Sequence, residues 1–166
     1  MFTMKKPIPR SMGDLLEDLQ CDYPVVTLTG PRQSGKTTLC RMAFADLPYE
    51  NLEAPDIREF AQSDPRGFLA RHPNGCVIDE FQRCPELTSY IQVLVDDPGF
   101  NGTFVLTGSR NLAIRDTVSQ SLAGRTALAC LLPFSCQELG ALPREMSLDE
   151  MLWTGFYPRI HDKGLN

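Results

Sequence analysis

The sequence "VVTLTGPRQSGKTTLC" (residues 25–40) changes character partway along its length. Its first residues are mostly β-branched and apolar, which is typical of a buried strand. Residues 30–37 then match the pattern G-x-x-x-x-G-K-[ST] at every fixed position, and helical spacing of apolar residues resumes after Gly35. A strand before this pattern and a helix after it are the context that a phosphate-binding loop requires. The stretch therefore predicts a loop that wraps a phosphate group.

The residue types in this loop suit a nucleoside triphosphate with Mg²⁺. Glycines let backbone N–H groups turn inward onto phosphate oxygens, and the following helix directs its positive end at the same anion. We expect Lys36 to reach the β- and γ-phosphates and the Thr37 hydroxyl to bind Mg²⁺. The predicted nucleotide-binding residues are Gly30, Pro31, Arg32, Gln33, Ser34, Gly35, Lys36, Thr37 and Thr38.

Two acids, Asp79 and Glu80, follow the short apolar run "CVI". A carboxylate at the tip of a buried strand is costly to desolvate unless a cation or a hydrogen-bond donor meets it. We therefore predict that Asp79 holds Mg²⁺ together with Thr37. One residue further on, Glu80 is placed to polarise an attacking water as general base. The alternative is a pair of acids that simply opens an exposed loop.

A later strand, "VLTGS" (105–109), also ends in polar residues. If this strand lies between the lysine strand and the acidic strand, its tip faces the γ-phosphate. Thr107 and Ser109 are then predicted to hydrogen-bond the water or the phosphate. A turn built on Gly108, with hydroxyls that serve the backbone, is the alternative.

Two arginines near strand ends are candidates for stabilising negative charge in the transition state. Arg110 follows "VLTGS", and Arg125 precedes the apolar run of residues 126–134. A well-placed arginine accelerates phosphoryl transfer roughly 10³–10⁵-fold, but each of these is equally well read as a surface residue. Arg32 lies inside the loop and is compatible with a position facing solvent. The predicted catalytic residues are Lys36, Glu80, Thr107, Ser109 and Arg125.

The order of apolar segments predicts the fold class. Strand patterns occur at residues 25–30, 49–53, 75–80, 103–109 and 126–134, and helical patterns lie between them. This alternation predicts a three-layer α/β sandwich with a five-stranded, mainly parallel sheet. We expect a single domain that spans residues 1–166, with a helical extension over 1–22 and closing helices over 134–166.

Several helix starts carry a recognisable capping residue. Ser11 opens an S-x-x-D signal before residues 12–19, and Asp64 precedes a proline at the first position of a short helix. The sequences "SCQE" (135–138) and "SLDE" (147–150) predict two further helix starts near the end of the chain.

Composition excludes several classes of protein. The chain has 166 residues, 42% of them hydrophobic, and a net charge of −5, which argues against broad, nonspecific binding to nucleic acid. The longest apolar run, "ALACLLPF", is shorter than the roughly 20 residues of a membrane span, and the first residues do not form a signal peptide. The six cysteines form no C-x-x-C pair, so we expect reduced thiols in a cytoplasmic protein rather than a zinc site.

Several separated motifs together resemble a known family. They are "TGPRQSGKTTL", "NLEAPDIREFAQSDPRGFL", "VIDEFQRCPEL", "VLTGSRN", "SLAGRTALACLLPFS" and "GFYPRI". They resemble the AAA-type ATP-binding proteins of bacteria and archaea, which usually carry a C-terminal domain of unknown function. The resemblance covers nearly the whole chain. It implies a P-loop nucleoside-triphosphatase core with the additional-strand sheet order, with Mg²⁺ and ATP bound at Lys36, Thr37, Asp79 and Glu80.

The sequence stops at Asn166, where members of that family continue into a second domain. Without such a domain we expect weaker contacts to the adenine and impaired catalysis where it needs a neighbouring subunit. An apolar segment near the end forms either a surface for a protein partner or for self-association, or part of the core. Its residues are Met151, Leu152, Trp153, Phe156 and Tyr157.

Three functions are compatible with these patterns. The favoured one is an ATPase whose hydrolysis drives or resets a conformational switch. A nucleotide-regulated binding module with negligible turnover and a small-molecule kinase are the alternatives. Glu80 directly after Asp79 favours activation of water over transfer to another acceptor.

Overall fold

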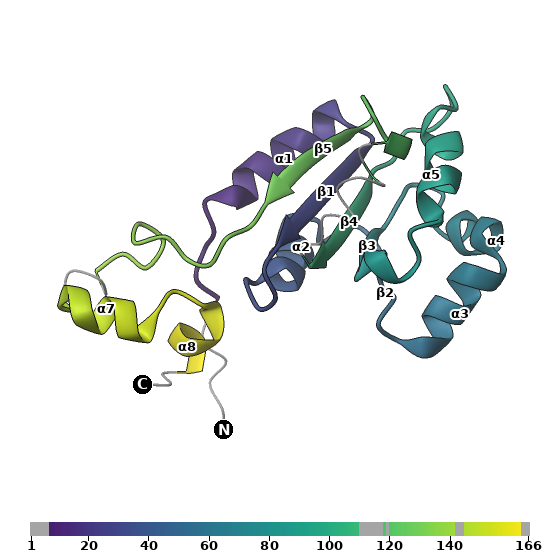
Figure 1. The fold of residues 1–166 in the computed structure, drawn as a ribbon. Helices are drawn as coiled ribbons and strands as arrows, with labels where there is room; N and C mark the ends of the chain where they lie inside the picture. The colour runs from purple at the N-terminus through teal and green to yellow at the C-terminus, as the bar shows by residue number, and fades with distance from the viewer. Residues whose placement is uncertain (1–6, 110–117, 119, 142–144, 164–166) are drawn as a thin grey trace.

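The computed structural model describes residues 7–109, 118, 120–141 and 145–163, and it places a parallel sheet between two layers of helices (Figure 1). The strands are β1 (Val25–Gly30), β2 (Tyr49–Asn51), β3 (Val77–Asp79), β4 (Phe104–Ser109) and β5 (Thr126–Cys130). The helices are α1 (Met12–Asp22), α2 (Lys36–Ala43), α3 (Pro55–Ser63), α4 (Pro65–Ala70), the 3₁₀ helix η1 (Phe81–Arg83), α5 (Leu87–Val95), α7 (Leu148–Thr154) and α8 (Pro158–Lys163).

The strands are ordered β2-β3-β4-β1-β5, and each pair of neighbours is parallel. The additional strand β4 therefore separates β1, which leads into the loop, from β3, which carries the acids. Both the three-layer α/β prediction and the predicted strand order are confirmed. Because parallel strands end at the same edge of a sheet, the tips of β1, β4 and β3 lie side by side.

Apolar side chains cover the two faces of the sheet in separate clusters. On one face, Val26, Leu28, Val77 and Val105 pack with α1 and α2 through Leu16, Leu39 and Cys40. On the other face, Val25, Ile78, Phe104 and Leu106 pack with α3, α4 and α5 through Ala61, Phe68, Leu69, Leu87 and Ile91. Successive strand residues alternate between these clusters, as the pleat of a strand requires. This packing makes the sheet a firm base for the loops at its carboxyl end.

Two of the predicted helix caps form as expected. The Asp64 carboxylate accepts a hydrogen bond from the Gly67 N–H at 2.9 Å, and Pro65 is the first residue of α4. At α7, the Ser147 hydroxyl accepts from the Glu150 N–H, while the Glu150 side chain accepts from the Ser147 N–H. Local signals specify these helix starts because cap and helix lie within four residues of each other.

Two other predicted helix starts differ in the structure. Ser11 does not cap α1 with its side chain, because its backbone is already helical, with a φ of −58° and a ψ of −22°, and its N–H donates to the Glu138 carboxylate of a distant segment at 2.9 Å. Ser135 and Glu138 exchange the bonds of a capping box, yet no helix follows. The chain instead turns at Gly140, whose φ is 65°.

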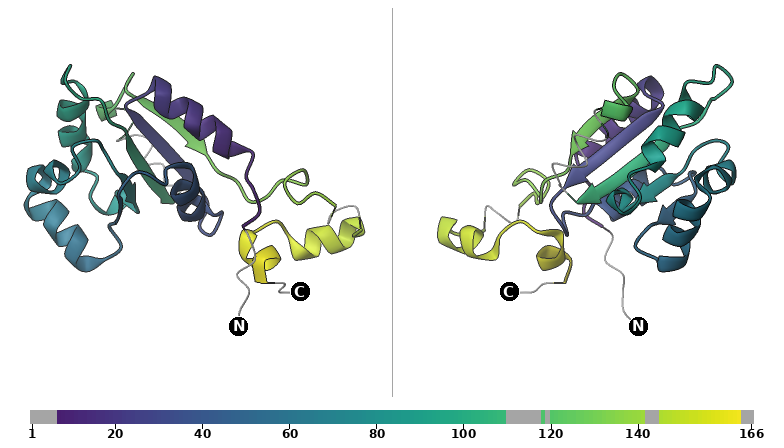
Figure 2. Two further views of the ribbon diagram at one scale, coloured as in Figure 1. Left: turned by 180° about the vertical axis from the view of Figure 1, so that it is seen from behind. Right: turned by 45° about the vertical axis from the view of Figure 1, so that its right-hand side comes forward.

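Helices α7 and α8 lie beyond the carboxyl end of the sheet, to one side of it (Figures 1 and 2). Helix α8 has no counterpart in the sequence-based prediction. In α7, Leu152 is 70% exposed and Trp153 is 92% exposed. These two side chains therefore form part of an open apolar surface and do not close the core.

Some predictions fall on residues outside the described part of the chain. These include Arg110 and most of the helix expected before Leu122. Val118 and Leu122 are described, and both are buried in the cluster that contains α3, α4 and α5. Among the helices of the described residues, none is long and apolar enough to cross a bilayer.

Candidate functional site

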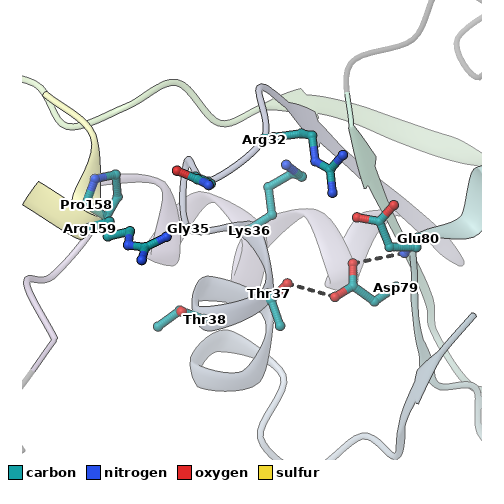
Figure 3. A pocket seen from close by; sticks show the side chains of 10 residues that line it. Arg32, Gly35, Lys36, Thr37, Thr38, Asp79, Glu80, Pro158 and Arg159 are labelled. Atoms are coloured by element: carbon teal, nitrogen blue, oxygen red, sulfur yellow. Dashed lines mark hydrogen bonds between the residues drawn. The ribbon is translucent and has the colours of Figure 1, made fainter. Parts of the chain in front are cut away.

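A pocket of about 700 Å³ opens at the carboxyl end of the sheet (Figure 3). Residues from the glycine loop, the start of α2, the tip of β3 and the start of α8 line it. They are Arg32, Gln33, Gly35, Lys36, Thr37, Thr38, Asp79, Glu80, Pro158 and Arg159. The pocket thus gathers the loop and the two acids that the sequence motifs singled out.

The backbone of the loop adopts conformations that its glycines permit. Gly35, the residue before α2, has a φ of 94°, and a β-carbon on Gly30 would collide with the backbone carbonyl of Leu131. Gln33 also has a positive φ, 64°, which is uncommon for a residue with a side chain. Such strain persists where a ligand site needs it, which fits an anion-binding loop.

Lys36 lies inside the loop and is 7% exposed. Its ammonium donates hydrogen bonds to the carbonyl oxygens of Gly30 at 3.1 Å and Pro31 at 2.8 Å. Burial lowers the pKa of Lys36, and the nearby carboxylates of Glu80 and Asp79 oppose that shift. The ammonium therefore has only weak carbonyl partners in this state, and phosphate oxygens are stronger acceptors for it.

Asp79 is the centre of a hydrogen-bond network and is only 4% exposed. Its Oδ2 accepts from the Thr37 hydroxyl at 2.7 Å and from the Tyr49 hydroxyl, as Figure 3 shows for Thr37. Its Oδ1 accepts from the Thr107 hydroxyl at 2.8 Å and from the Glu80 N–H at 3.0 Å. The structure thus brings together Thr37 and Asp79, the two residues predicted to hold Mg²⁺.

The hydroxyls of β4 do not line the pocket. Thr107 is 1% exposed and is turned toward Asp79, and the Ser109 hydroxyl lies 3.3 Å from the Gln82 amide nitrogen. A direct contact from Thr107 or Ser109 to water or phosphate stays a prediction. In this structure Thr107 orients Asp79, and Ser109 contacts Gln82, whose amide in turn donates to Glu80.

Glu80 lines the pocket and has an unusual backbone conformation, with a φ of 54°. Its carboxylate accepts a hydrogen bond from the side-chain amide of Gln82. This amide also lies near Ser109 Oγ, so Gln82 joins the tips of β3 and β4. The carboxylate predicted to be the general base is thus held by a neighbour on its own loop.

Arg125 lies at the opposite end of the sheet from the pocket, which corrects its prediction as a catalytic residue. It directly precedes β5, whose first residue is paired with Val25 at the start of β1. Its guanidinium makes a two-point ion pair with Asp96, at the end of α5. The sequence places Arg125 next to a strand, but the parallel direction of that strand puts it at the amino end.

Several residues at the site were not predicted from the sequence. Tyr49 is at the start of β2, Gln82 is in η1, and Arg159 is in α8. Burial and the hydrogen bond to Asp79 raise the pKa of Tyr49, so its hydroxyl remains a donor. None of the three belongs to the loop motif, although "GFYPRI", which contains Arg159, is one of the motifs of the family resemblance.

A small apolar crevice adjoins the pocket at Gly35, Thr38 and Pro158. Its remaining walls come from the segment before α1, from α2 and from the segment after β5. They are Pro7, Ile8, Arg10, Leu39, Met42 and Phe134. The two cavities together offer a polar compartment next to an apolar one.

The loop and its acids fit a nucleotide with Mg²⁺. Gly30, Pro31 and Ser34 contribute backbone to the loop without lining the pocket, and the buried Ser34 hydroxyl has no partner among the described residues. Thr37 and Asp79 provide hydroxyl and carboxylate oxygens, the donors that Mg²⁺ prefers.

Comparison with known proteins agrees with this geometry. An AAA domain family model matches residues 22–140. Two curated relatives, the uncharacterized proteins Mb2031c of Mycobacterium bovis and Rv2008c of Mycobacterium tuberculosis, are each 36% identical over 131 residues. That match covers 78% of this chain but only 29% of either relative.

Solved structures share the fold at low sequence identity. The Walker-type ATPase PABY2304 of Pyrococcus abyssi has a TM-score of 0.64 and 16% identity, and the match covers 94% of this chain and 67% of that one. A DNA replication initiation factor has a TM-score of 0.54 and 15% identity, over 91% of this chain and 56% of its own. Because the family model covers more than half of the chain, the protein belongs to the AAA domain family and has the fold of a P-loop ATPase core.

Proposed function

We propose that the chain binds ATP with Mg²⁺ and hydrolyses it to drive or reset a conformational switch. One observation carries the proposal: Lys36, Thr37, Asp79 and Glu80 converge on a single pocket beside a glycine loop. Membership of the AAA domain family supports the same conclusion. ATP is taken as the usual nucleotide of such sites.

The proposed binding mode uses groups that already face the pocket. Lys36 would exchange its contacts with Gly30 O and Pro31 O for phosphate oxygens. Thr37 and Asp79 would hold Mg²⁺, which supplies positive charge to the phosphate oxygens when bound. Tyr49 and Thr107 would keep the Asp79 carboxylate in place through their hydrogen bonds.

Glu80 is the proposed general base. Its carboxylate faces the pocket, so it can accept a proton from a water that attacks the terminal phosphate. Gln82 donates to one of its oxygens, and the other oxygen remains to accept that proton. Ser109, beside Gln82, would help to hold the Gln82 amide in place through its own contact with it.

Arg159 replaces Arg125 as the proposed phosphate-contacting arginine. It lines the pocket from α8, opposite the acids, and Figure 3 shows its side chain beside Gly35. Arg32, an exposed residue of the loop, is the second cation at the rim. The small crevice beside Thr38 marks the side of the pocket on which we propose that the base lies, because it adjoins the polar pocket and its walls are mostly apolar, with Arg10 on one side.

Thermal denaturation with and without Mg·ATP tests the binding. A ligand present at about 100 times its dissociation constant adds roughly 2.7 kcal/mol, which raises the melting temperature by about 5–11 °C in a domain of this size. We expect Lys36→Ala to abolish the rise and Arg125→Ala, at the other end of the sheet, to keep it. A Lys36→Ala protein that still responds would show that the nucleotide binds elsewhere.

Phosphate release tests the reaction. ATP alone should yield inorganic phosphate without any added acceptor, which separates hydrolysis from a kinase activity. Glu80→Gln should lower the turnover roughly 10²–10⁴-fold while it leaves nucleotide binding intact. A turnover that is unchanged in Glu80→Gln would remove Glu80 from the role of general base.

A binding module with negligible turnover is the second candidate, and the contact between Gln82 and Glu80 favours it. If this contact persists when nucleotide is bound and keeps the carboxylate turned away from the attacking water, hydrolysis is slow. Gln82→Ala should then raise the turnover, whereas Gln62→Ala, an exposed glutamine of α3, should not. Equal turnover in the unaltered chain and in Gln82→Ala would argue against this candidate.

A further inference from the structure

Arg10, in the segment before α1, joins three parts of the molecule that are distant in sequence. Its Nη1 donates to the carbonyl of Ser34 in the glycine loop at 2.8 Å. Its Nη2 donates to the carbonyl of Leu132 at 2.7 Å, and its Nε pairs with Glu138 Oε1 at 3.0 Å. The guanidinium also lies 4.8 Å from the centre of the Phe134 ring. Arg10 also lines the crevice proposed for the base, but its guanidinium has been given no role so far.

Glu138 fixes the orientation of Arg10. Besides Arg10, its carboxylate accepts from the backbone N–H groups of Ser11 at 2.9 Å and Ser135 at 2.8 Å. Burial opposes the charge, but these hydrogen bonds outweigh it and hold the pKa of Glu138 below its ordinary value. The two side chains are 9% and 8% exposed, so the ion pair is nearly enclosed.

The contact with Ser34 bears directly on the anion site. A peptide unit is planar and trans, so the carbonyl of Ser34 and the N–H of Gly35 point in opposite directions. The guanidinium that holds Ser34 O therefore also sets the direction of the Gly35 N–H. Gly35 lines the pocket and is the residue before α2, where backbone N–H groups of such loops meet phosphate.

We propose that Arg10 is a positioning residue for the nucleotide: it holds the Ser34–Gly35 peptide in its binding orientation and anchors it to the segment of residues 132–138. The proposal rests on the proposed function and deepens it. It gives the segment before α1, which lies outside the loop motif, a role in the nucleotide site.

The chemistry of the pair argues for a specific role rather than for general stability. Burying an arginine and a glutamate costs solvation free energy, and apolar residues of similar size often stabilise a fold as well or better. The three nitrogens of the planar Arg10 guanidinium each meet a different acceptor, whereas a lysine ammonium presents its donors from a single atom. The arrangement thus places one rigid side chain against the back of the loop.

Titration of a nonhydrolysable ATP analogue with Mg²⁺ and steady-state turnover at varied ATP concentration test the proposal together. In Arg10→Ala we expect the dissociation constant and KM to rise about tenfold or more, while the turnover at saturation stays within about threefold. The dissociation constant of Arg10→Lys should lie between those of the unaltered chain and of Arg10→Ala, because lysine keeps the charge but reaches fewer acceptors. Arg125→Ala serves as the matched control and should bind as the unaltered chain does.

A double variant checks that the two residues act as one unit. Arg10→Ala combined with Glu138→Gln should bind no more weakly than Arg10→Ala alone, since Glu138 acts only through Arg10. Circular dichroism identifies variants that fail to fold, and if Arg10→Ala is one of them, Arg10→Lys and Glu138→Gln decide the question.

Unchanged nucleotide affinity in folded Arg10→Ala, or in both conservative variants, would overturn the inference and leave the proposed function standing. If the unaltered chain itself binds no nucleotide, the proposed function fails, and the inference fails with it.

Discussion

The two ends of the parallel sheet hold their charged residues in different ways. At the carboxyl end, Lys36 and Asp79 are 7% and 4% exposed, and both are surrounded by hydrogen-bond partners. At the amino end, Arg125 and Asp96 form a pair whose side chains are 32% and 46% exposed. Burying charge is costly, whereas an exposed pair costs and contributes little. Lys36 and Asp79 line the pocket, so a bound ligand would compensate the cost of burying them.

Residues with strained backbone conformations are also distributed unequally between the two ends of the sheet. Gln33 and Glu80, the non-glycine residues with positive φ in the described part of the chain, both lie at the carboxyl end. At the amino end, the positive φ of 87° falls on Gly75, where a β-carbon would collide with Thr103. At the amino end, a glycine adopts the positive φ without steric strain. At the carboxyl end, two residues that carry side chains adopt a positive φ and bear the strain. This contrast is typical of a sheet that uses only one end for chemistry.

Of the substitutions that test this contrast, removal of the Asp79 side chain should change stability and nucleotide binding the most. In Asp79→Ala, the hydroxyls of Thr37, Tyr49 and Thr107 lose their shared acceptor. Thr107 is buried, and a buried donor left unpaired costs about 1–3 kcal/mol, whereas the exposed Thr37 can turn to water. We expect a clear fall in the free energy of unfolding in urea, and loss of the dependence of ATP affinity on Mg²⁺.

The matched variant at the amino end is Asp96→Ala, which removes an exposed carboxylate. Its stability and its Mg²⁺ dependence should remain close to those of the unaltered chain. Should Asp96→Ala prove as disruptive as Asp79→Ala, the distinction between the ends would have no energetic basis.

Two arginines give the second comparison. Arg159→Ala removes a cation from the pocket wall, and loss of a charge-assisted hydrogen bond of about 1.5–3 kcal/mol predicts ATP binding that is about 10–100-fold weaker. Arg125→Ala removes the same charge from the other end of the sheet and should change the affinity less than about twofold. Isothermal titration of both variants measures this difference. A stronger effect of Arg125→Ala would restore it as the functional arginine.

Features that depend on residues close together in the sequence could be predicted from it. The strands, the glycine loop and the caps at Asp64 and Ser147 are specified within a few residues, so they are readable from the sequence alone. Asp79 and Glu80 lie at the tip of β3, and Lys36 and Thr37 begin α2 after the loop that follows β1, so parallel pairing of the strands brings all four to one edge of the sheet.

The failures share a physical cause, which is contact between distant segments. Ser11 does not cap α1, and its N–H donates instead to Glu138 from a distant segment. Arg125 is correctly placed just before a strand, but that end of the sheet lies away from the pocket. Arg10 and Tyr49 carry no local signal, since their partners lie far away in the chain. Only the assembled sheet brings these groups to the loop.

Tyr49→Phe should give a smaller effect than either comparison above. The change removes one hydroxyl that donates to Asp79 Oδ2, while Thr37 still supplies a donor to the same oxygen. A loss of about 0.5–1.5 kcal/mol in the free energy of unfolding is expected. Mg²⁺ titration of the ATP affinity should show a shift smaller than about tenfold. Tyr23→Phe, at the exposed end of α1, is the control and should show neither change.

The smallest expected effect is the loss of folding stability at low pH that comes from two carboxylates, Asp96 and Glu138. Hydrogen bonding to Arg125 lowers the pKa of Asp96, and the hydrogen bonds to Glu138 lower its pKa despite its burial. A carboxyl group whose pKa is lower in the folded state stabilises the fold above its unfolded value, here 4.5 for Glu138, and loses that contribution as the pH falls. The difference in stability between the unaltered chain and Glu138→Gln should therefore shrink as the medium is acidified below that value.

Salt then separates the two carboxylates. At 1 M salt the screening length is about 3 Å, so the exposed Asp96 pair should lose its small contribution, and Asp96→Asn should match the unaltered chain. Glu138, nearly enclosed with Arg10, should keep most of its pH-dependent contribution in the same buffer. Urea denaturation across pH at low and high salt measures both. Salt screens the ion pair that water reaches. If the contribution of Asp96 to stability survived high salt while that of Glu138 vanished, the Glu138 pair would be the exposed one, and the contrast drawn here would be wrong.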